Sequence, residues 1–132
     1  MSALTRDRAT PYREGIEIEY PVAANTKIYA GSLVCISAAG YAVPAADTSG
    51  YRFAGVAMEQ VDNSDGGQSV RLRRAGVFEF DAVSITQDMV GVAMYAADDH
   101  TFDDAAGPTN DIKVGQLVKY VSATKGWIDI AR

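Results

Sequence analysis

The sequence predicts an all-β fold, a small β-sandwich or barrel that follows an extended N-terminal arm. Three observations lead to this prediction. Apolar and polar residues alternate with a period of two in several short segments, which is the pattern of a strand with one solvated face. Glycine, proline, aspartate and serine separate these segments. No long window shows the 3.6-residue periodicity of an amphipathic helix.

The first 13 residues have the character of an arm. They carry Arg6, Arg8 and Arg13 against Asp7, a local charge of +2, so the rest of the chain carries −7 of the total of −5. Pro11 and the lack of apolar periodicity favour an extended segment. We therefore expect an extended flexible arm at residues 1–13 and a single β-rich domain at residues 14–132.

The domain divides into about ten short segments with strand character. Residues 15–20 alternate apolar side chains with Glu17 and Glu19, and Pro21 ends the pattern. The apolar run at 33–36 turns back into 41–44 and predicts a hairpin. Further strands are expected at residues 53–58, 70–73, 77–81, 92–96, 117–121 and 127–130.

Residues between and within these strands carry more specific signals. Gly55, inside a strand, indicates a bulge or a close backbone approach. Residues 85–89 fit one helical turn or a loop, and residues 97–111, with five aspartates, fit a long loop or a short hairpin. Phe78 and Phe80 alternate with a glutamate and are expected in the core. Trp127 is expected to seal one end of the barrel.

Two segments of the chain resemble each other. Residues 31–41 and residues 115–127 both consist of a glycine, an apolar strand, a small polar turn, a glycine followed by an aromatic residue, and a second strand. The pattern fits a duplicated unit, and it fits equally two hairpins that converged on the same turn chemistry.

The sequence offers few groups for catalysis or metal binding. His100 is the single histidine and Cys35 the single cysteine, so an HExxH zinc site and an internal disulfide are excluded. We expect a buried, inert Cys35 and a solvated His100. The acidic pairs at 98–99 and 103–104 lack the spacing of an EF-hand. We therefore expect no enzyme activity, no catalytic residue, no cofactor and no metal.

Arg71, Arg73 and Arg74 form the basic cluster of the domain. On a strand, Arg71 and Arg73 share one face. The cluster could bind a phosphate backbone or an acidic partner, but an acidic domain favours pairing with carboxylates of the same chain. An acidic pI near 4.7 also makes nucleic acid an unlikely partner for bulk electrostatic binding. No apolar run is long enough to span a membrane.

The order of glycines and strands resembles that of the capsid decoration, or head cement, proteins of tailed bacteriophages. In particular it resembles a phage family of unknown function whose members are often labelled recombinase-like. The resemblance spans roughly residues 14–130. It rests on Ala30–Val34, Gly40, Gly55–Ala57, Gly66 and Gly67 with Val70, Gly76–Phe78, Val90 and Gly91 with Tyr95, and Val114–Val118.

The resemblance implies a β-tulip or β-clip fold without catalysis. Such proteins bind the major capsid protein on the outer surface of the virion, commonly as trimers at three-fold positions, and stabilise the head. The resemblance makes the arm a candidate capsid contact, with candidate residues Arg6, Arg8, Tyr12 and Arg13. The alternative is a nucleic-acid-binding, recombinase-associated accessory domain that uses Arg71, Arg73 and Arg74. A small enzyme or carbohydrate-binding module is a third possibility.

Overall fold

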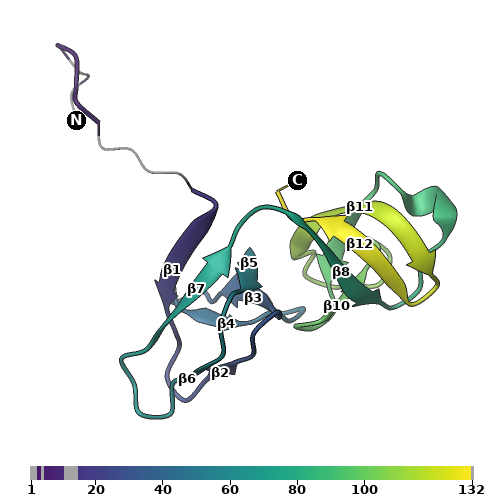
Figure 1. Ribbon diagram of the computed structural model, residues 1–132, viewed down its shortest axis with the longest axis horizontal. Helices are drawn as coiled ribbons and strands as arrows, with labels where there is room; N and C mark the ends of the chain where they lie inside the picture. Colours follow the sequence, from purple (N-terminus) through teal and green to yellow (C-terminus); the bar gives the residue numbers. More distant parts are fainter. Residues whose placement is uncertain (1–2, 4, 11–14, 132) are drawn as a thin grey trace.

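A computed structural model describes residues 3, 5–10 and 15–131 of the chain (Figure 1). The all-β prediction is confirmed, because the described residues form twelve strands and one short 3₁₀ turn. The assignment to the β-tulip or β-clip type stays a prediction. The elements are β1 (Glu17–Pro21), β2 (Lys27–Ile28), β3 (Leu33–Ile36), β4 (Ala42–Pro44), β5 (Arg52–Ala57), β6 (Val61–Asp62), β7 (Ser69–Arg73), β8 (Val77–Ala82), η1 (Gln87–Met89), β9 (Ala93–Ala96), β10 (Thr101–Asp103), β11 (Lys113–Ser122) and β12 (Lys125–Asp129).

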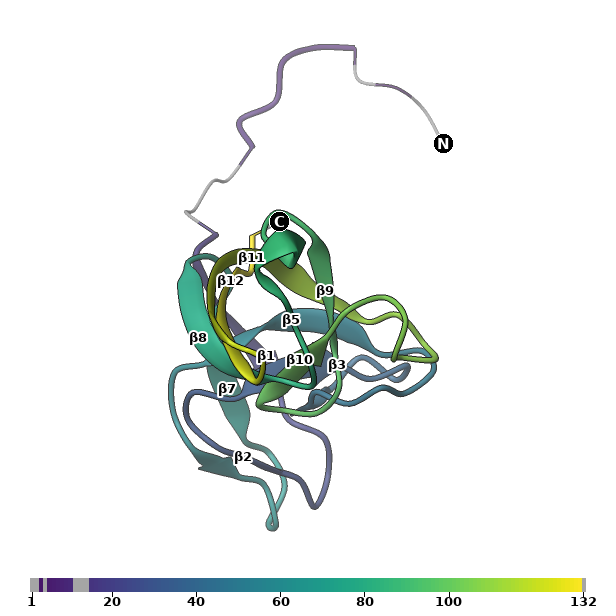
Figure 2. The ribbon, with the colours of Figure 1, turned by 90° about the vertical axis from the view of Figure 1, so that its right-hand side faces the viewer.

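The strands form a twisted sheet that packs against a closed barrel. The five-stranded sheet has the order β1-β7-β5-β3-β4, and all its pairs are antiparallel. The barrel has the order β10-β8-β12-β11-β9, in which only β8 and β10 run parallel. Strands β2 and β6 form a separate small ribbon. Figure 1 shows the sheet beside the barrel, with the β2–β6 ribbon below the sheet, and Figure 2 views the molecule from the barrel side.

Strand β3 is buried on both of its faces. Leu33 and Cys35 point into a large core that the sheet shares with the barrel, whereas Val34 points into a second core on the opposite face. All three side chains are 0% exposed. A strand buried on both faces needs a continuous apolar run, and residues 33–36 supply one. Full burial of each such side chain contributes roughly 1.5–3 kcal/mol.

The two cores differ in their partners. The large core joins β3 to the barrel, and its largest fully buried members from the barrel side are Phe102, Met94, Leu117 and Ile128. Phe80 belongs to this core, so its expected position is confirmed, whereas Phe78 is half-buried and packs against the core from its margin. The second core lies between the sheet and the β2–β6 ribbon. Strands β2 and β6 contain two residues each, too few for a recognisable alternation in the sequence.

Both alternatives proposed for Gly55 are present. The pairing of β3 with β5 shifts register between Val34 and Cys35, which is a bulge on the Gly55 side. A Cβ atom on Gly55 would also lie 2.5 Å from the carbonyl oxygen of Arg73. Gly115 has the same role in the barrel, where a Cβ atom would lie 2.4 Å from the carbonyl oxygen of Asp129. The absence of a side chain therefore lets two strands approach closely at each site.

The two segments that resemble each other both form hairpins, β3–β4 and β11–β12. Their glycines nevertheless have different roles. Gly31 and Gly40 lie in turns with φ of 81° and 94°, whereas Gly115 and Gly126 lie within strands. This difference favours convergence on similar turn chemistry over a duplicated unit.

The expectation that Trp127 seals the barrel is wrong. Its neighbours Gly126 and Ile128 are buried, so the alternation of β12 turns Trp127 to the outer face. There it is half-buried and lies opposite Glu79 of β8. The aspartate-rich segment, by contrast, contains the short hairpin that was one of its two predicted forms, with β10 paired to β9.

Buried and half-buried polar side chains tie the loops together. Asn63 is 2% exposed, and its amide donates to the carbonyl oxygens of Val22 (2.9 Å) and Ala23 (3.0 Å). Its Oδ1 accepts the N–H of Gln68 at 2.9 Å. Asn63 thus satisfies its hydrogen-bonding groups inside the fold and holds residues 22–23 and 68 in place around its own turn.

Asp47 ties the loop after β4 to the loop after β10. Its carboxylate accepts the backbone N–H groups of Thr109 and Asn110, each at 2.8 Å. These two hydrogen bonds lower the pKa of Asp47 below its ordinary value. The tie therefore joins the loop that follows the sheet strand β4 to the loop that follows the barrel strand β10.

We expect the substitution Asp47→Asn to lower stability at neutral pH, because an amide nitrogen cannot accept the second N–H. Since the folded pKa of Asp47 lies below the unfolded value, its contribution is present above about pH 4 and is lost as the pH falls through the folded pKa. Thermal melts from pH 7 to pH 3 should show the two proteins converging in acid. A constant difference across this range would contradict the assignment.

Candidate docking surface

Strand β1 is an open edge of the sheet. It pairs with β7 on one side, from Glu17 opposite Arg73 to Pro21 opposite Ser69, and no described strand pairs with its other side. The opposite edge, β4, is covered: Val22 forms a parallel bridge with Ala42, and Ala23 N–H donates to the Ala42 carbonyl oxygen at 3.0 Å. An open edge offers unpaired backbone groups to another chain.

The two faces of β1 have opposite character. Ile18 and Tyr20 are half-buried and pack against the second core. Glu17 and Glu19 are exposed on the other face, as the alternation in the sequence predicts. The exposed row makes the strand acidic along its solvated side.

The arginines of β7 lie beside these glutamates. Glu17 is the register partner of Arg73, and Glu19 is the register partner of Arg71. Opposite charges on directly opposed residues of antiparallel strands stabilise a sheet by roughly 0.2–1 kcal/mol per pair. Arg71 also lies near Glu59, with Nε 3.7 Å from Oε1. This geometry agrees with the expectation that Arg71 and Arg73 pair with carboxylates of the same chain.

The three arginines of the basic cluster do not act as one patch. Arg71 and Arg73 are exposed on the same face of β7, as expected from their spacing. Arg74 follows the end of the strand, and its N–H donates to the carbonyl oxygen of Ile16 at 2.6 Å. Its guanidinium lies toward Gly15, in a shallow hollow with Phe53 and the C-terminal end of β12.

The described part of the arm is exposed throughout. Residues 5–10 stand clear of the sheet and the barrel in both views (Figures 1 and 2). Arg8 makes a local hydrogen bond, from Nη1 to Thr10 Oγ1 at 3.1 Å, and Arg6 is exposed. Tyr12 and Arg13, the other two candidate contact residues, lie outside the described residues.

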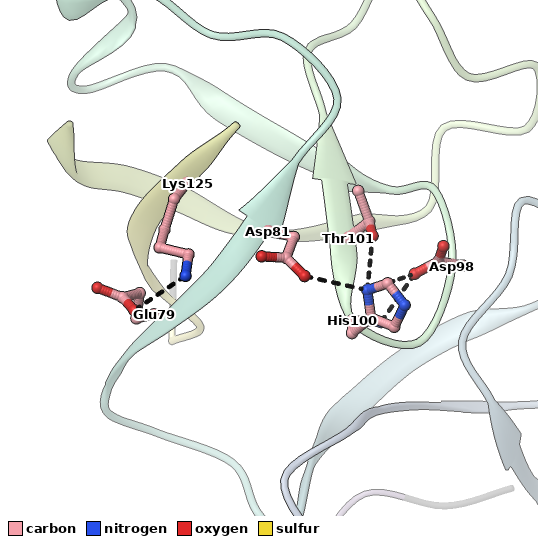
Figure 3. Close-up of polar contacts among 6 residues, drawn as sticks. All are labelled: Glu79, Asp81, Asp98, His100, Thr101 and Lys125. Carbon is pink, nitrogen blue, oxygen red and sulfur yellow. Dashed lines mark hydrogen bonds and ion pairs between the residues drawn. The ribbon is translucent and has the colours of Figure 1, made fainter. Parts of the chain in front are cut away.

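His100 lies in the tight connection between β9 and β10, and its ring is solvated as expected (Figure 3). Its Nδ1 atom is 2.8 Å from Thr101 Oγ1 and 3.4 Å from carboxylate oxygens of both Asp81 and Asp98. Asp98 Oδ1 also accepts the backbone N–H of His100 at 2.9 Å. These contacts shape the turn.

Two further groups could hold a metal ion or act as a nucleophile. Ligand atoms of Asp98, Asp99 and His100 lie within 4.8 Å of one another, an arrangement that is common in exposed acidic loops without an ion. Cys35 is fully buried, and burial raises the pKa of its thiol to about 12. In the described residues no hydrogen bond joins Cys35 to His100, so they form no nucleophile–base pair there.

The structure has a hollow between the sheet and the barrel that the sequence does not predict. It has a volume of about 400 Å³ and is open to solvent. Arg73 lies on its sheet side, and Glu79 and Trp127 lie on its barrel side. Its walls come from segments far apart in the chain, so no local pattern in the sequence marks it. Polar groups that converge on one point, as in a binding site for a small molecule, are not evident there.

Comparisons of the chain with protein-family models, with curated proteins and with solved structures find no match. Within the described residues, no helix has the length and apolar character needed to cross a membrane.

We expect Cys35 to be inert in the folded protein. A thiol reagent at pH 8 should label no cysteine in the native state and one cysteine after unfolding, because the thiolate is the reactive form and the side chain is inaccessible. Quantitative mass spectrometry of both samples checks this. Rapid native labelling would contradict the position of Cys35 in the core.

Proposed function

We propose that this protein is a non-enzymatic structural protein of a phage head. It binds the major capsid protein on the outer surface of the capsid, as a trimer at three-fold positions, and stabilises the head. The observation that carries the proposal is the open edge of β1, which directly follows an exposed, basic arm. The resemblance to head decoration proteins supports the identity of the partner.

An open strand edge and an extended arm suit binding to other proteins. An extended segment that adds to a sheet gains backbone hydrogen bonds along its length, and alternate side chains provide specificity. A segment that becomes ordered on binding can span a wide surface. Arginines in the arm suit carboxylates on a neighbouring subunit, with which they form charge-assisted hydrogen bonds.

The chemistry of the described residues also fits a binding protein better than an enzyme. The single histidine is solvated in a turn, and the single cysteine is buried in the core. The distinctive feature of the described residues is the open edge of β1, which offers unpaired backbone groups to a partner chain.

We expect the purified protein to bind expanded heads of the phage whose genome encodes it, and not immature heads. Deletion of residues 1–13 should weaken binding at least tenfold while the domain stays folded, because the arm supplies part of the contact. Co-sedimentation with heads, followed by electron microscopy, measures both effects. Circular dichroism and a thermal melt of the deleted protein serve as the folding control.

Failure of the full-length protein to bind expanded heads would refute the proposed function. Unchanged binding after the deletion would remove the arm from the contact, while leaving the domain as the binding unit.

The alternative function, a nucleic-acid-binding accessory domain, is less well supported by the geometry. A phosphate backbone needs several cations on one face, whereas Arg71 and Arg73 each lie directly opposite a glutamate, Glu19 and Glu17, on the neighbouring strand. We therefore expect no shift of single- or double-stranded DNA in a gel at 50 mM salt and micromolar protein. A shift that disappears in an Arg71→Glu, Arg73→Glu variant would instead favour the alternative.

A further inference from the structure

We propose that the open edge of β1 binds the arm of a second copy of this chain, with Arg6 and Arg8 of one copy paired to Glu19 and Glu17 of the next. The inference rests on the oligomer in the proposed function and names the contact that holds it together. In the assembled oligomer the edge of β1 and Arg6 and Arg8 are used between copies, so the capsid contact is left to the rest of the arm and to the outer surface of the domain. It makes the glutamates of β1 the receiving site and the arm the inserted strand.

The edge of β1 and residues 5–10 of the arm are both unoccupied in the described structure. The outer side of β1 is unpaired in the described residues, and natural sheets usually cover or protect such an edge. Residues 5–10 are exposed and make no contact with the sheet or the barrel in either view (Figures 1 and 2). Each copy thus carries one free edge and one free extended segment.

The glutamates of β1 and the arginines of the arm have the same spacing along the chain. Glu17 and Glu19 are two residues apart and lie on one exposed face of β1. Arg6 and Arg8 are also two residues apart, so in an extended strand they share a face with the same repeat. An antiparallel register that sets Arg8 opposite Glu17 also sets Arg6 opposite Glu19.

An arm added beside β1 would continue the alternation of charge that β7 and β1 begin. Arg71 and Arg73 of β7 already face the two glutamates from one side. An added arm would face them from the other side, giving rows of arginine, glutamate and arginine on three adjacent strands. Opposite charges on neighbouring strands are favourable, and a network is worth more than an isolated surface pair.

The occupant is the arm of another copy and not of the same chain, because residues 5–10 lie away from their own β1 in the structure. Binding replaces the local contact between Arg8 and Thr10. Proline lacks an N–H, so Pro11 limits the added strand to the residues before it. A contact that passes in one direction from the arm of one copy to the edge of the next is heterologous, and it gives a ring such as a trimer when the rotation between copies closes.

The test is charge reversal in the full chain, read out as mass by sedimentation velocity without any capsid present. Wild-type protein should be oligomeric. Arg6→Glu with Arg8→Glu should weaken self-association by on the order of tenfold or more, since like charges directly opposite destabilise a strand pair. Adding Glu17→Arg and Glu19→Arg to the same chain should restore part of the self-association, because the reversed pairs attract again while Arg73 and Arg71 still oppose the new arginines.

The matched control is Lys113→Glu with Lys119→Glu, which makes the same change in net charge on exposed barrel positions and should leave the oligomer intact. The arm variant is the primary test, because reversal at Glu17 and Glu19 alone also opposes Arg73 and Arg71. A monomeric wild-type protein, or an oligomer unaffected by the arm reversal, would overturn the proposal.

Cross-linking tests which copy supplies the arm. Mixing an Arg8→Cys protein with a Glu17→Cys protein should give disulfide-linked dimers, whereas mixing Arg8→Cys with Lys119→Cys should not. Cys35 does not interfere because it is fully buried. A disulfide that forms only within a chain carrying both Arg8→Cys and Glu17→Cys would overturn the proposal in favour of the chain's own arm.

These outcomes are independent of capsid binding. If the arm reversal abolishes the oligomer but wild-type protein does not bind heads, the contact stands and the proposed function fails. If wild-type protein binds heads and the reversal leaves its mass unchanged, the function stands and this contact fails.

Discussion

The double burial of β3 is the constraint on which the rest of the structure depends. Leu33 and Cys35 close the core that joins the sheet to the barrel, and Val34 closes the core above the β2–β6 ribbon. Neither core could form without this strand, since each takes alternate side chains from it. A polar substitution at any of these positions would leave a buried group without a partner, which is among the most costly changes a fold can undergo.

The β1–β7 pair lies on the other side of β5 from β3 and ends at the open edge of the sheet. Strand β7 meets β5 at two register positions, Val56 opposite Arg73 and Ala57 opposite Leu72. Strands β7 and β1 lie on the side of the sheet away from the barrel (Figure 1). One face of this pair still covers the second core through Ile18 and Leu72. The other face has no apolar layer to cover it, so it can carry arginine and glutamate at no cost in core packing.

This arrangement separates the part of the protein that provides stability from the part that offers contacts. The barrel is closed and has no open edge, whereas the sheet keeps β1 free at one side. Charged pairs on an exposed edge contribute little to stability and are screened by salt, but they give orientation and register to an incoming strand. The proposed role in a phage head would use this separation, because the open edge can accept a partner while the cores keep the domain folded.

The sequence by itself determined the all-β class, the β3–β4 and β11–β12 hairpins, the bulge at Gly55 and the alternation of Glu17 and Glu19, because each is written in local periodicity or turn chemistry. It also identified Arg71 and Arg73 as residues of one face. It misplaced Trp127, whose direction depends on which face of β12 the barrel encloses. Only the tertiary structure decided that β1 is an open edge, that Glu17 and Glu19 face Arg73 and Arg71, and that a closed barrel stands beside the sheet. Pairing joins residues more than fifty positions apart, and long-range register leaves no local signal in the chain.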